Sequence, residues 1–195
     1  MAGSATISDR GAHGAHRYLI ALGSNRRHGR HGAPRLVLAA AVEALEEAGL
    51  AVEAVSPVLH TAPLGPSRRR FANAALVARS ALPPLDLLAL FKRVERAFGR
   101  RRGGRWGARV LDLDIVLWSG GICADPALSI PHPAFRARSF VLEPALVVAP
   151  AWRDPVTGLA IRHLHARLTA PRPLPRARAD GRSRPPGPPP PFGGP

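Results

Sequence analysis

The chain has 195 residues, of which 46% are hydrophobic, and its formal net charge is +15. This length suits a single domain, and the hydrophobic fraction excludes a wholly disordered chain. The single cysteine, Cys123, excludes an intrachain disulfide and a cysteine-based zinc cage, and no apolar run approaches the roughly 18 residues of a membrane span. We therefore expect a cytoplasmic protein without a membrane partner, and the charge favours a polyanionic ligand.

Both ends of the chain have the composition of disordered segments. Residues 1–16 are small and polar without periodicity, and residues 171–195 are rich in proline and arginine. Such segments cannot bury enough apolar surface to offset the entropy lost on ordering. We predict one folded domain, residues 17–170, between a disordered N-terminus and a disordered tail.

Strand-like and helix-like patterns alternate within the predicted domain. In chain order they predict a strand at 18–22, a helix at 36–48, strands at 51–59 and 71–78, a helix at 83–98 and a strand at 110–118. This order is the split βαβ arrangement of ferredoxin-like folds, in which two helices cover one face of an antiparallel sheet. We predict the α+β class, with a ferredoxin-like βαββαβ core. Residues 119–170 are expected to add a hairpin and at least one helix, at 140–148.

Two aspartates lie in the last predicted core strand. Asp112 and Asp114 are two residues apart, so their side chains share one face, whereas Leu111, Leu113 and Ile115 point to the other face and the core. Aspartate is disfavoured in strands, so the pair calls for a cation or arginines nearby. Mg²⁺ prefers carboxylate oxygens and takes phosphates and waters as further ligands. The spacing alone is equally consistent with an exposed, solvated pair on a polar face.

Arginines cluster around this strand and in two loops. Lys92 is the only lysine among 28 basic residues, and seven arginines lie between positions 93 and 109. Two further clusters fall at 26–35 and 68–70. The planar guanidinium matches phosphate oxygens, so an aspartate pair with metal ions and arginines suits phosphoryl-type transfer. A solvated basic face, or contacts to a nucleic-acid backbone, are the alternatives for the arginines.

Several segments together resemble the 6-hydroxymethyl-7,8-dihydropterin pyrophosphokinase family. They are Ala-Leu-Gly-Ser-Asn at 21–25, Thr-Ala-Pro-Leu-Gly at 61–65, Phe-Ala-Asn-Ala at 71–74, Arg-Trp-Gly through Asp-Leu-Asp-Ile at 105–115, Ile-Pro-His-Pro at 130–133 and Arg-Ser-Phe-Val-Leu at 138–142. The resemblance implies transfer of pyrophosphate from ATP to the hydroxymethyl group of the pterin, with release of AMP, in folate biosynthesis. ATP and the pterin are then the small-molecule partners.

The resemblance also implies roles for residues of this chain. Asp112 and Asp114 would hold two Mg²⁺ ions. The catalytic residues would be Arg100, Arg105, Trp106 and Arg109, of which Arg105 and Trp106 lie in a loop that closes over the site in the family. The pterin would contact Thr61, Leu64, Phe71, Asn73 and Phe140. ATP would contact Lys92, Glu95, Arg102, Ile115, His132 and Arg138, with Arg101 as the alternative to Arg102.

The chain departs from the family pattern after Asn25. The family usually continues with a short Leu-Gly-Asp-type turn, whereas residues 26–34 form a longer, basic segment here. A ferredoxin-like RNA-binding module is the alternative function, since such folds bind RNA through an aromatic-bearing sheet. The low aromatic fraction of 5% and the two aspartates argue against it, so we expect no nucleic-acid partner. A monomer is expected, with a homodimer as the alternative.

Overall fold

The computed structural model describes residues 15–62, 70–99 and 110–171. The predicted disordered segments, 1–16 and 171–195, lie outside these ranges apart from residues 15, 16 and 171, so the predicted domain boundaries stay predictions. None of the helices among the described residues is long and apolar enough to cross a membrane.

An antiparallel sheet forms the centre of the described structure. Its strands are β1 (His16–Ser24), β2 (Ala51–Val55), β3 (Leu59–Thr61), β4 (Phe71–Ser80) and β5 (Asp112–Trp118). The order across the sheet is β2-β4-β1-β5, and β3 also pairs with β4. Each of these pairs is antiparallel. This is the strand order of the predicted ferredoxin-like core, and the predicted fold class is confirmed.

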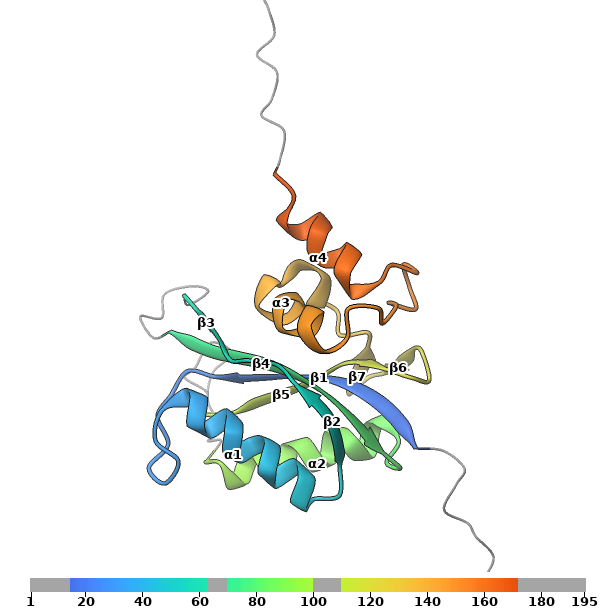
Figure 1. The fold of residues 1–195 in the computed structure, drawn as a ribbon. Helices are drawn as coiled ribbons and strands as arrows, with labels where there is room; N and C mark the ends of the chain where they lie inside the picture. The colour runs from blue at the N-terminus through green and yellow to red at the C-terminus, as the bar shows by residue number, and fades with distance from the viewer. Residues whose placement is uncertain (1–14, 63–69, 100–109, 172–195) are drawn as a thin grey trace, which may run out of the picture.

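Two helices, α1 (Pro34–Glu47) and α2 (Pro84–Ala97), cover one face of the sheet, called here the α1/α2 face (Figure 1). Both begin at a proline, whose missing N–H costs little in the first turn. Their apolar residues recur at helical spacing and bury against Tyr18, Ile20 and Leu22 of β1. The core of the protein therefore lies between this face and these helices.

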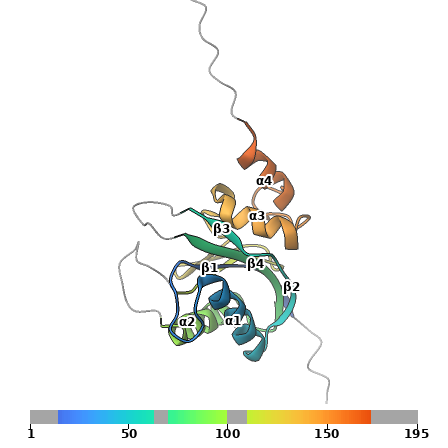
Figure 2. The ribbon, with the colours of Figure 1, turned by 60° about the vertical axis from the view of Figure 1, so that its left-hand side comes forward.

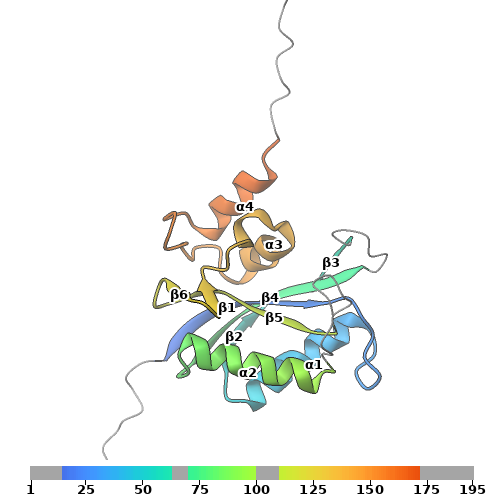
Figure 3. The ribbon, with the colours of Figure 1, turned by 180° about the vertical axis from the view of Figure 1, so that it is seen from behind.

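The opposite face, called here the α3 face, is also covered. There α3 (Ser139–Val148) and α4 (Ile161–Thr169) lie beyond the sheet, while β6 (Cys123–Asp125) and β7 (Leu128–Ile130) form a small hairpin beside it (Figures 1 and 3). The sequence predicts a hairpin and a helix at 140–148 after the core, which β6–β7 and α3 confirm, but it does not predict which face this helix covers. The reason for the second layer is a second apolar cluster, in which Leu19, Val77 and Leu117 of the sheet pack against residues of α3 such as Leu142.

Two irregularities of the strands were not predicted. The expected strand at 51–59 is divided into β2 and β3, because Pro57 has no N–H to continue the ladder. Ser56 at the break exchanges hydrogen bonds with Ala75 through its N–H and its hydroxyl oxygen. In β5, a bulge lets Ile115 pair with Ile20 while Leu117 pairs with Leu19, so the side-chain alternation changes phase there.

The C-terminal additions are held together by a partly buried ion pair between Arg136 and Asp154. Arg136 belongs to the short 3₁₀ helix η1 (Phe135–Ala137), and its Nε and Nη2 atoms donate to the two Asp154 oxygens at 2.8 and 2.7 Å. The Asp154 side chain is fully buried. Burial alone would raise the pKa of Asp154, but hydrogen bonds from Arg136, Thr157 and the Val156 N–H outweigh it and hold that pKa below the ordinary value. We call this pair with its hydrogen bonds the Arg136–Asp154 clamp.

Candidate active site

Three residues from adjacent strands form a cross-strand row on the α3 face. Gly23 of β1 lies opposite Asn73 of β4 on one side and opposite Asp112 of β5 on the other. Residues directly opposite in an antiparallel pair present their side chains to the same face. Asp114 lies opposite Ala21, on the same face as Asp112. The sheet therefore brings the predicted metal ligands and the predicted pterin ligand Asn73 to one surface.

The alternation of β5 separates this surface from the core as the sequence predicts. Asp112 and Asp114 are half-buried, whereas Leu113 and Ile115 are buried on the α1/α2 face. The residues opposite the aspartates, Gly23 and Ala21, are small, which leaves room above them. A Cβ atom at Gly23 would lie 3.8 Å from Asn73 Oδ1 and 3.9 Å from Asp112 Cβ. Bare backbone thus separates the Asn73 amide from the Asp112 carboxylate.

The bare backbone at Gly23 leads to a first prediction. Gly23→Ala should be tolerated, since its Cβ makes ordinary contacts, whereas the branched side chain of Gly23→Val would enter the space between Asn73 and Asp112. We expect Gly23→Val to lose most AMP release from ATP while it keeps its far-ultraviolet circular dichroism spectrum, and Gly23→Ala to retain activity. Equal activity of the two variants would show that this space is not used.

Basic side chains from three parts of the chain surround Asp114. Burial, and after it the Asp112 carboxylate, raise the pKa of Asp114 above its ordinary value. Three basic side chains oppose this rise, in order of effect His132 after β7, through its protonated form, Lys92 of α2 and Arg138 at the start of α3. The structure therefore gathers Lys92, His132 and Arg138, all predicted ATP contacts, about the predicted metal ligand.

His132 is held as a neutral imidazole with a defined proton position. Burial, followed by repulsion from Arg138, lowers its pKa, and these effects outweigh the opposing carboxylates of Asp114 and Asp112. Its Nδ1 atom accepts the Ala134 N–H at 3.3 Å, so the proton of the neutral ring is on Nε2. The main-chain N–H of His132 donates to the Val116 carbonyl at 3.0 Å, which ties this segment to β5. His132 can therefore donate a hydrogen bond to a ligand without bringing a full positive charge.

The two aspartates fit a hard divalent cation such as Mg²⁺. Within the described ranges, no group of three or more His, Cys, Asp or Glu side chains is placed to hold a metal ion by itself. Two carboxylates on one face supply only oxygen donors and leave the remaining coordination positions to phosphate and water, which is the usual mode of Mg²⁺ binding. The donor set is therefore that of a metal bound together with a phosphorylated substrate.

The predicted pterin contacts lie beside the cross-strand row. Phe71 and Thr61 are opposite each other on β4 and β3, and Asn73 Nδ2 donates to Thr61 Oγ1 at 2.9 Å. With its Nδ2 toward Thr61, Asn73 has its oxygen on the Gly23 side. Phe140 comes from the first turn of α3, and the Arg138 guanidinium lies 5.7 Å from its ring centroid. The structure brings Thr61, Phe71 and Asn73 together, with Phe140 supplied by the helix that packs on the same face.

Two predicted ATP contacts are placed differently from the rest. Glu95 is fully buried, accepts the Leu113 N–H at 3.0 Å and pairs with Lys92 at 3.2 Å. It fastens β5 between the two aspartates, and in this structure it offers no surface to a nucleotide. Ile115 is 2% exposed and its side chain lies in the core, so a nucleotide could meet only its main chain. Helical spacing from Phe91 puts Glu95 on the buried face of α2. The family resemblance, which assigns Glu95 to ATP, drew attention away from this spacing.

Six predicted site residues lie outside the described residues. They are Leu64, Arg100, Arg102, Arg105, Trp106 and Arg109, and their roles stay predictions. Conversely, Gly23 is expected from sequence in a tight turn after the first strand, whereas it lies within β1, and sequence reasoning gives no role to Arg136 or Asp154. The signal for Gly23 is its place directly opposite both a predicted metal ligand and a predicted substrate ligand. This place becomes visible only once the strand register is known.

Comparison with known proteins identifies the family. The family model described as 7,8-dihydro-6-hydroxymethylpterin-pyrophosphokinase (HPPK) matches residues 19–150. A 2-amino-4-hydroxy-6-hydroxymethyldihydropteridine pyrophosphokinase of Pseudomonas aeruginosa is 40% identical over 141 residues, which cover 71% of this chain and 84% of that protein. The enzyme of the same name from Bacillus subtilis is 38% identical over 127 residues, covering 64% of this chain and 73% of the relative.

Solved structures show the same fold. A crystal structure of wild-type HPPK-DHPS from Plasmodium falciparum superposes with a TM-score of 0.60 at 13% identity, covering 78% of this chain and 44% of that chain. At this identity the likeness concerns the fold alone, and this chain spans less than half of that protein. The family model, by contrast, matches well over half of this chain, and the motif resemblance is confirmed: the chain belongs to the 7,8-dihydro-6-hydroxymethylpterin-pyrophosphokinase (HPPK) family.

Proposed function

We propose that this chain transfers the pyrophosphoryl group of ATP to the hydroxymethyl group of 6-hydroxymethyl-7,8-dihydropterin, releasing AMP, in folate biosynthesis. The observation that carries the proposal is the row Asn73–Gly23–Asp112. In this row the Asn73 amide, which can hydrogen-bond to a pterin, lies beside the aspartate pair. Family membership supports the same reaction. Two carboxylates on the sheet face would repel an RNA backbone, which weighs against the alternative of an RNA-binding module.

The aspartate pair serves the triphosphate. Asp112 and Asp114 would hold Mg²⁺, with two ions expected, and bound Mg²⁺ supplies charge neutralisation of the phosphates and polarisation of the pterin hydroxyl. Arg138 and Lys92, which act on the Asp114 carboxylate, would pair with phosphate oxygens or the nucleotide, and His132 would donate from Nε2. Because these groups come from α2, the segment after β7 and the start of α3, they would hold the triphosphate from several sides.

The pterin is proposed to bind between two aromatic rings. Phe71 of β4 and Phe140 of α3 would stack on its two faces, which is a favourable arrangement for a flat heteroaromatic ring. Asn73 would accept an N–H of the ring with its Oδ1 atom, since Nδ2 is held by Thr61. This orientation would direct the hydroxymethyl group across Gly23 toward the aspartates.

The test of the proposed function is AMP release from ATP by the purified full chain. Release should require both the pterin and Mg²⁺, and omission of either should reduce it to background. AMP release that is equal without the pterin would indicate an ATP hydrolase and contradict the proposal. A pterin product that carries one phosphate instead of two, accompanied by ADP, would contradict the assigned reaction type.

The domain boundaries and cellular setting belong to the same proposal. We place the enzyme domain at residues 17–170, in the cytoplasm, as a monomer; the single cysteine and the use of ATP support that compartment. Deleting residues 171–195 should leave kcat and KM for ATP nearly unchanged, because every described site residue lies before position 171. A large rise in KM for ATP in the truncated chain would show instead that the tail contributes to phosphate binding.

A further inference from the structure

We propose that a depression beside the C-terminal end of β1 binds a small phosphate-bearing anion, at a site separate from the proposed active site. The depression has a volume of about 490 Å³ and is lined by Asn25, Arg26, Arg27, Pro34 and Arg70. We call it the arginine depression. Its volume is within the usual range for small-ligand sites. None of its lining residues belongs to the proposed pterin, metal or nucleotide contacts.

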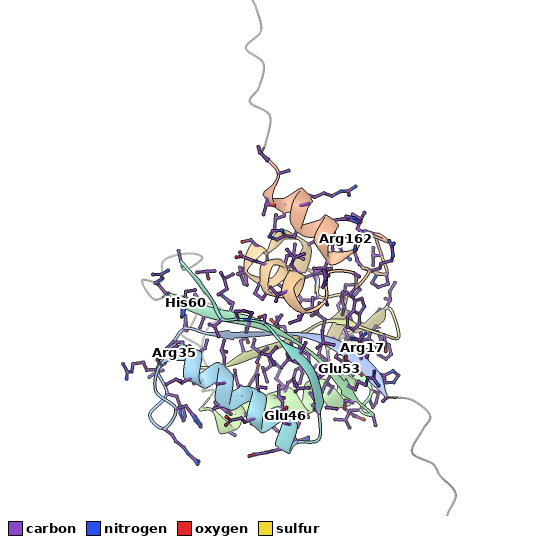
Figure 4. The ribbon with its side chains drawn as sticks, viewed as in Figure 1. Arg17, Arg35, Glu46, Glu53, His60 and Arg162 are labelled. Atoms are coloured by element: carbon purple, nitrogen blue, oxygen red, sulfur yellow. The ribbon has the colours of Figure 1, made fainter. Side chains whose placement is uncertain are left out.

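Two segments distant in sequence build the arginine depression, the β1–α1 connection and the residue before β4. Arg26 and Arg27 follow the end of β1, Pro34 begins α1, and Arg70 immediately precedes β4. Figure 2 shows the β1–α1 connection beside the start of α1, at the end of the sheet from which β3 also projects. In Figure 4, Arg35 on α1 and His60 on β3 mark this same end of the molecule. The fold therefore brings Arg70 to the same hollow as Arg26 and Arg27.

The charge of the arginine depression is not neutralised by the described acidic side chains. The ion pairs found in residues 15–62, 70–99 and 110–171 use Arg17, Arg79, Lys92 and Arg136, and the first of these, Arg17 with Glu53, lies far from the depression (Figure 4). Arg26, Arg27 and Arg70 form none of them. Like charges around a hollow repel one another, and a bound anion would remove that repulsion. Guanidinium groups bind phosphate oxygens with two parallel hydrogen bonds, which favours phosphate as the ligand class.

The N-terminus of α1 adds to the positive potential. Its N-cap residue is Ala33, which has no side-chain acceptor, and its first turn contains no acidic residue. The aligned peptide dipoles of this 14-residue helix therefore place partial positive charge beside Pro34 without compensation from a cap. Helix dipole and guanidinium groups act in the same direction at the depression.

The segment that carries Arg26 and Arg27 is held in place before any ligand binds. His28 and Gly32 exchange two main-chain hydrogen bonds of 2.8 Å each, which close a tight turn. The His31 ring stacks on Phe98 at the end of α2, with centroids 4.9 Å apart, and His28 stacks on His31 at 4.7 Å. A preorganised loop loses less entropy on binding. This is the basic segment in which the chain departs from the family pattern, so the site is expected to be a property of this chain.

The experiment is a calorimetric titration of the full chain with inorganic pyrophosphate in a buffer containing a chelator. Without a divalent cation, Asp112 and Asp114 repel pyrophosphate from the proposed active site, and any binding by its basic residues is common to the three chains compared. Three chains are compared: wild type, the variant Arg26→Gln/Arg27→Gln/Arg70→Gln, and the control Arg93→Gln/Arg162→Gln/Arg167→Gln, which removes the same charge from exposed positions on α2 and α4. Wild type and control should bind alike, and the depression variant about tenfold more weakly or worse, since each charge-assisted hydrogen bond contributes strongly.

Three outcomes would overturn the proposal. Equal weakening in the depression variant and the control would mean a general effect of net charge, and unchanged binding in both would place pyrophosphate elsewhere. A short RNA that binds wild type far more tightly than pyrophosphate, and is released by the same three replacements, would assign the depression to nucleic acid. The single variant Arg70→Gln, far from the β1–α1 turn in sequence, should weaken binding in the same direction and guards against a local folding defect.

AMP release separates this inference from the proposed function. The depression variant should release AMP at the wild-type rate with saturating ATP, pterin and Mg²⁺, because its three arginines are outside the proposed active site. Loss of that activity in the variant would contradict a separate site. Absence of AMP release in wild type would contradict the proposed function and leave the pyrophosphate comparison intact as a test of the depression.

Discussion

Asp114→Asn should abolish AMP release while the fold persists. The replacement keeps the size of the side chain but removes one of two carboxylates that would hold Mg²⁺ against the triphosphate. Several kcal/mol of charge stabilisation depend on that metal, and each 1.4 kcal/mol is tenfold in rate, so we expect a loss of about a thousandfold or more. Asp112→Ala should act likewise. The measurement is kcat for AMP release, with Asp86→Asn, an exposed aspartate in the first turn of α2, as the matched control.

Asp114→Asn should not destabilise the metal-free protein. Burial and the Asp112 carboxylate raise the pKa of Asp114, so the folded state holds this proton more tightly than the unfolded state. Stability is therefore lost as the pH rises above the ordinary aspartate range, and an asparagine at this position avoids that loss. We expect the melting temperature of Asp114→Asn at neutral pH, with chelator, to equal or exceed that of wild type. Wild-type-like AMP release by this variant or by Asp112→Ala would contradict the metal assignment.

Arg136→Leu should give the largest loss of stability among the replacements considered. It removes the bidentate partner of the fully buried Asp154 carboxylate. Breaking a buried pair from one side costs about 3–5 kcal/mol, and we expect the lower end because the Arg136 side chain is 30% exposed. The measurement is the free energy of unfolding from urea denaturation. A loss no greater than that of Arg93→Leu, an exposed arginine of α2, would contradict a stabilising role for the clamp.

The pH dependence of the Arg136 variant checks the cause. In wild type the pKa of Asp154 is lowered, so its ionised form stabilises the fold at pH values above the ordinary aspartate pKa, and that stability is lost as the pH falls through the lowered value. Without Arg136, the stability that the protein loses as the pH falls through this range should be smaller. Arg136 also lies between His132 and Arg138 in sequence, so the variant should raise KM for ATP more than it lowers kcat. An unchanged KM for ATP would show that the Arg136–Asp154 clamp contributes to stability alone.

The aspartate surface could be predicted from sequence because strand alternation is a local rule. Leu111, Leu113 and Ile115 alternate with Asp112 and Asp114, and this pattern alone assigns the two faces. The helix at 140–148 is predicted from sequence, but its position on the second face is not, although β4 carries the signal: the strand is buried on nearly every residue, as happens when both faces are covered. The small residues at 72–75 concealed this signal, because alanine is compatible with exposed and buried positions alike.

Residues that act through long-range pairing were beyond sequence reasoning. Gly23 gains its meaning only when the register puts Asn73 and Asp112 on either side of it, which requires the order of three strands. Asp154 is a single aspartate in a loop, and nothing local indicates that Arg136, 18 residues earlier, neutralises it. The family resemblance assigns Glu95 to ATP, whereas in the structure its carboxylate accepts the Leu113 N–H.

The strand register also determines where the chain can tolerate changes in length. Asn73 and Asp112 are separated by two strand spacings of about 4.8 Å each, so β1 sets the distance between the proposed pterin and metal contacts through main-chain pairing. A one-residue insertion within residues 20–24 would shift this pairing and turn either Gly23 or the aspartates away from the α3 face. Beyond Asn25 the constraint ends, and there the chain carries its long basic segment. Relatives that differ in length are therefore expected to vary after the β1 strand and to keep its last five residues without gaps.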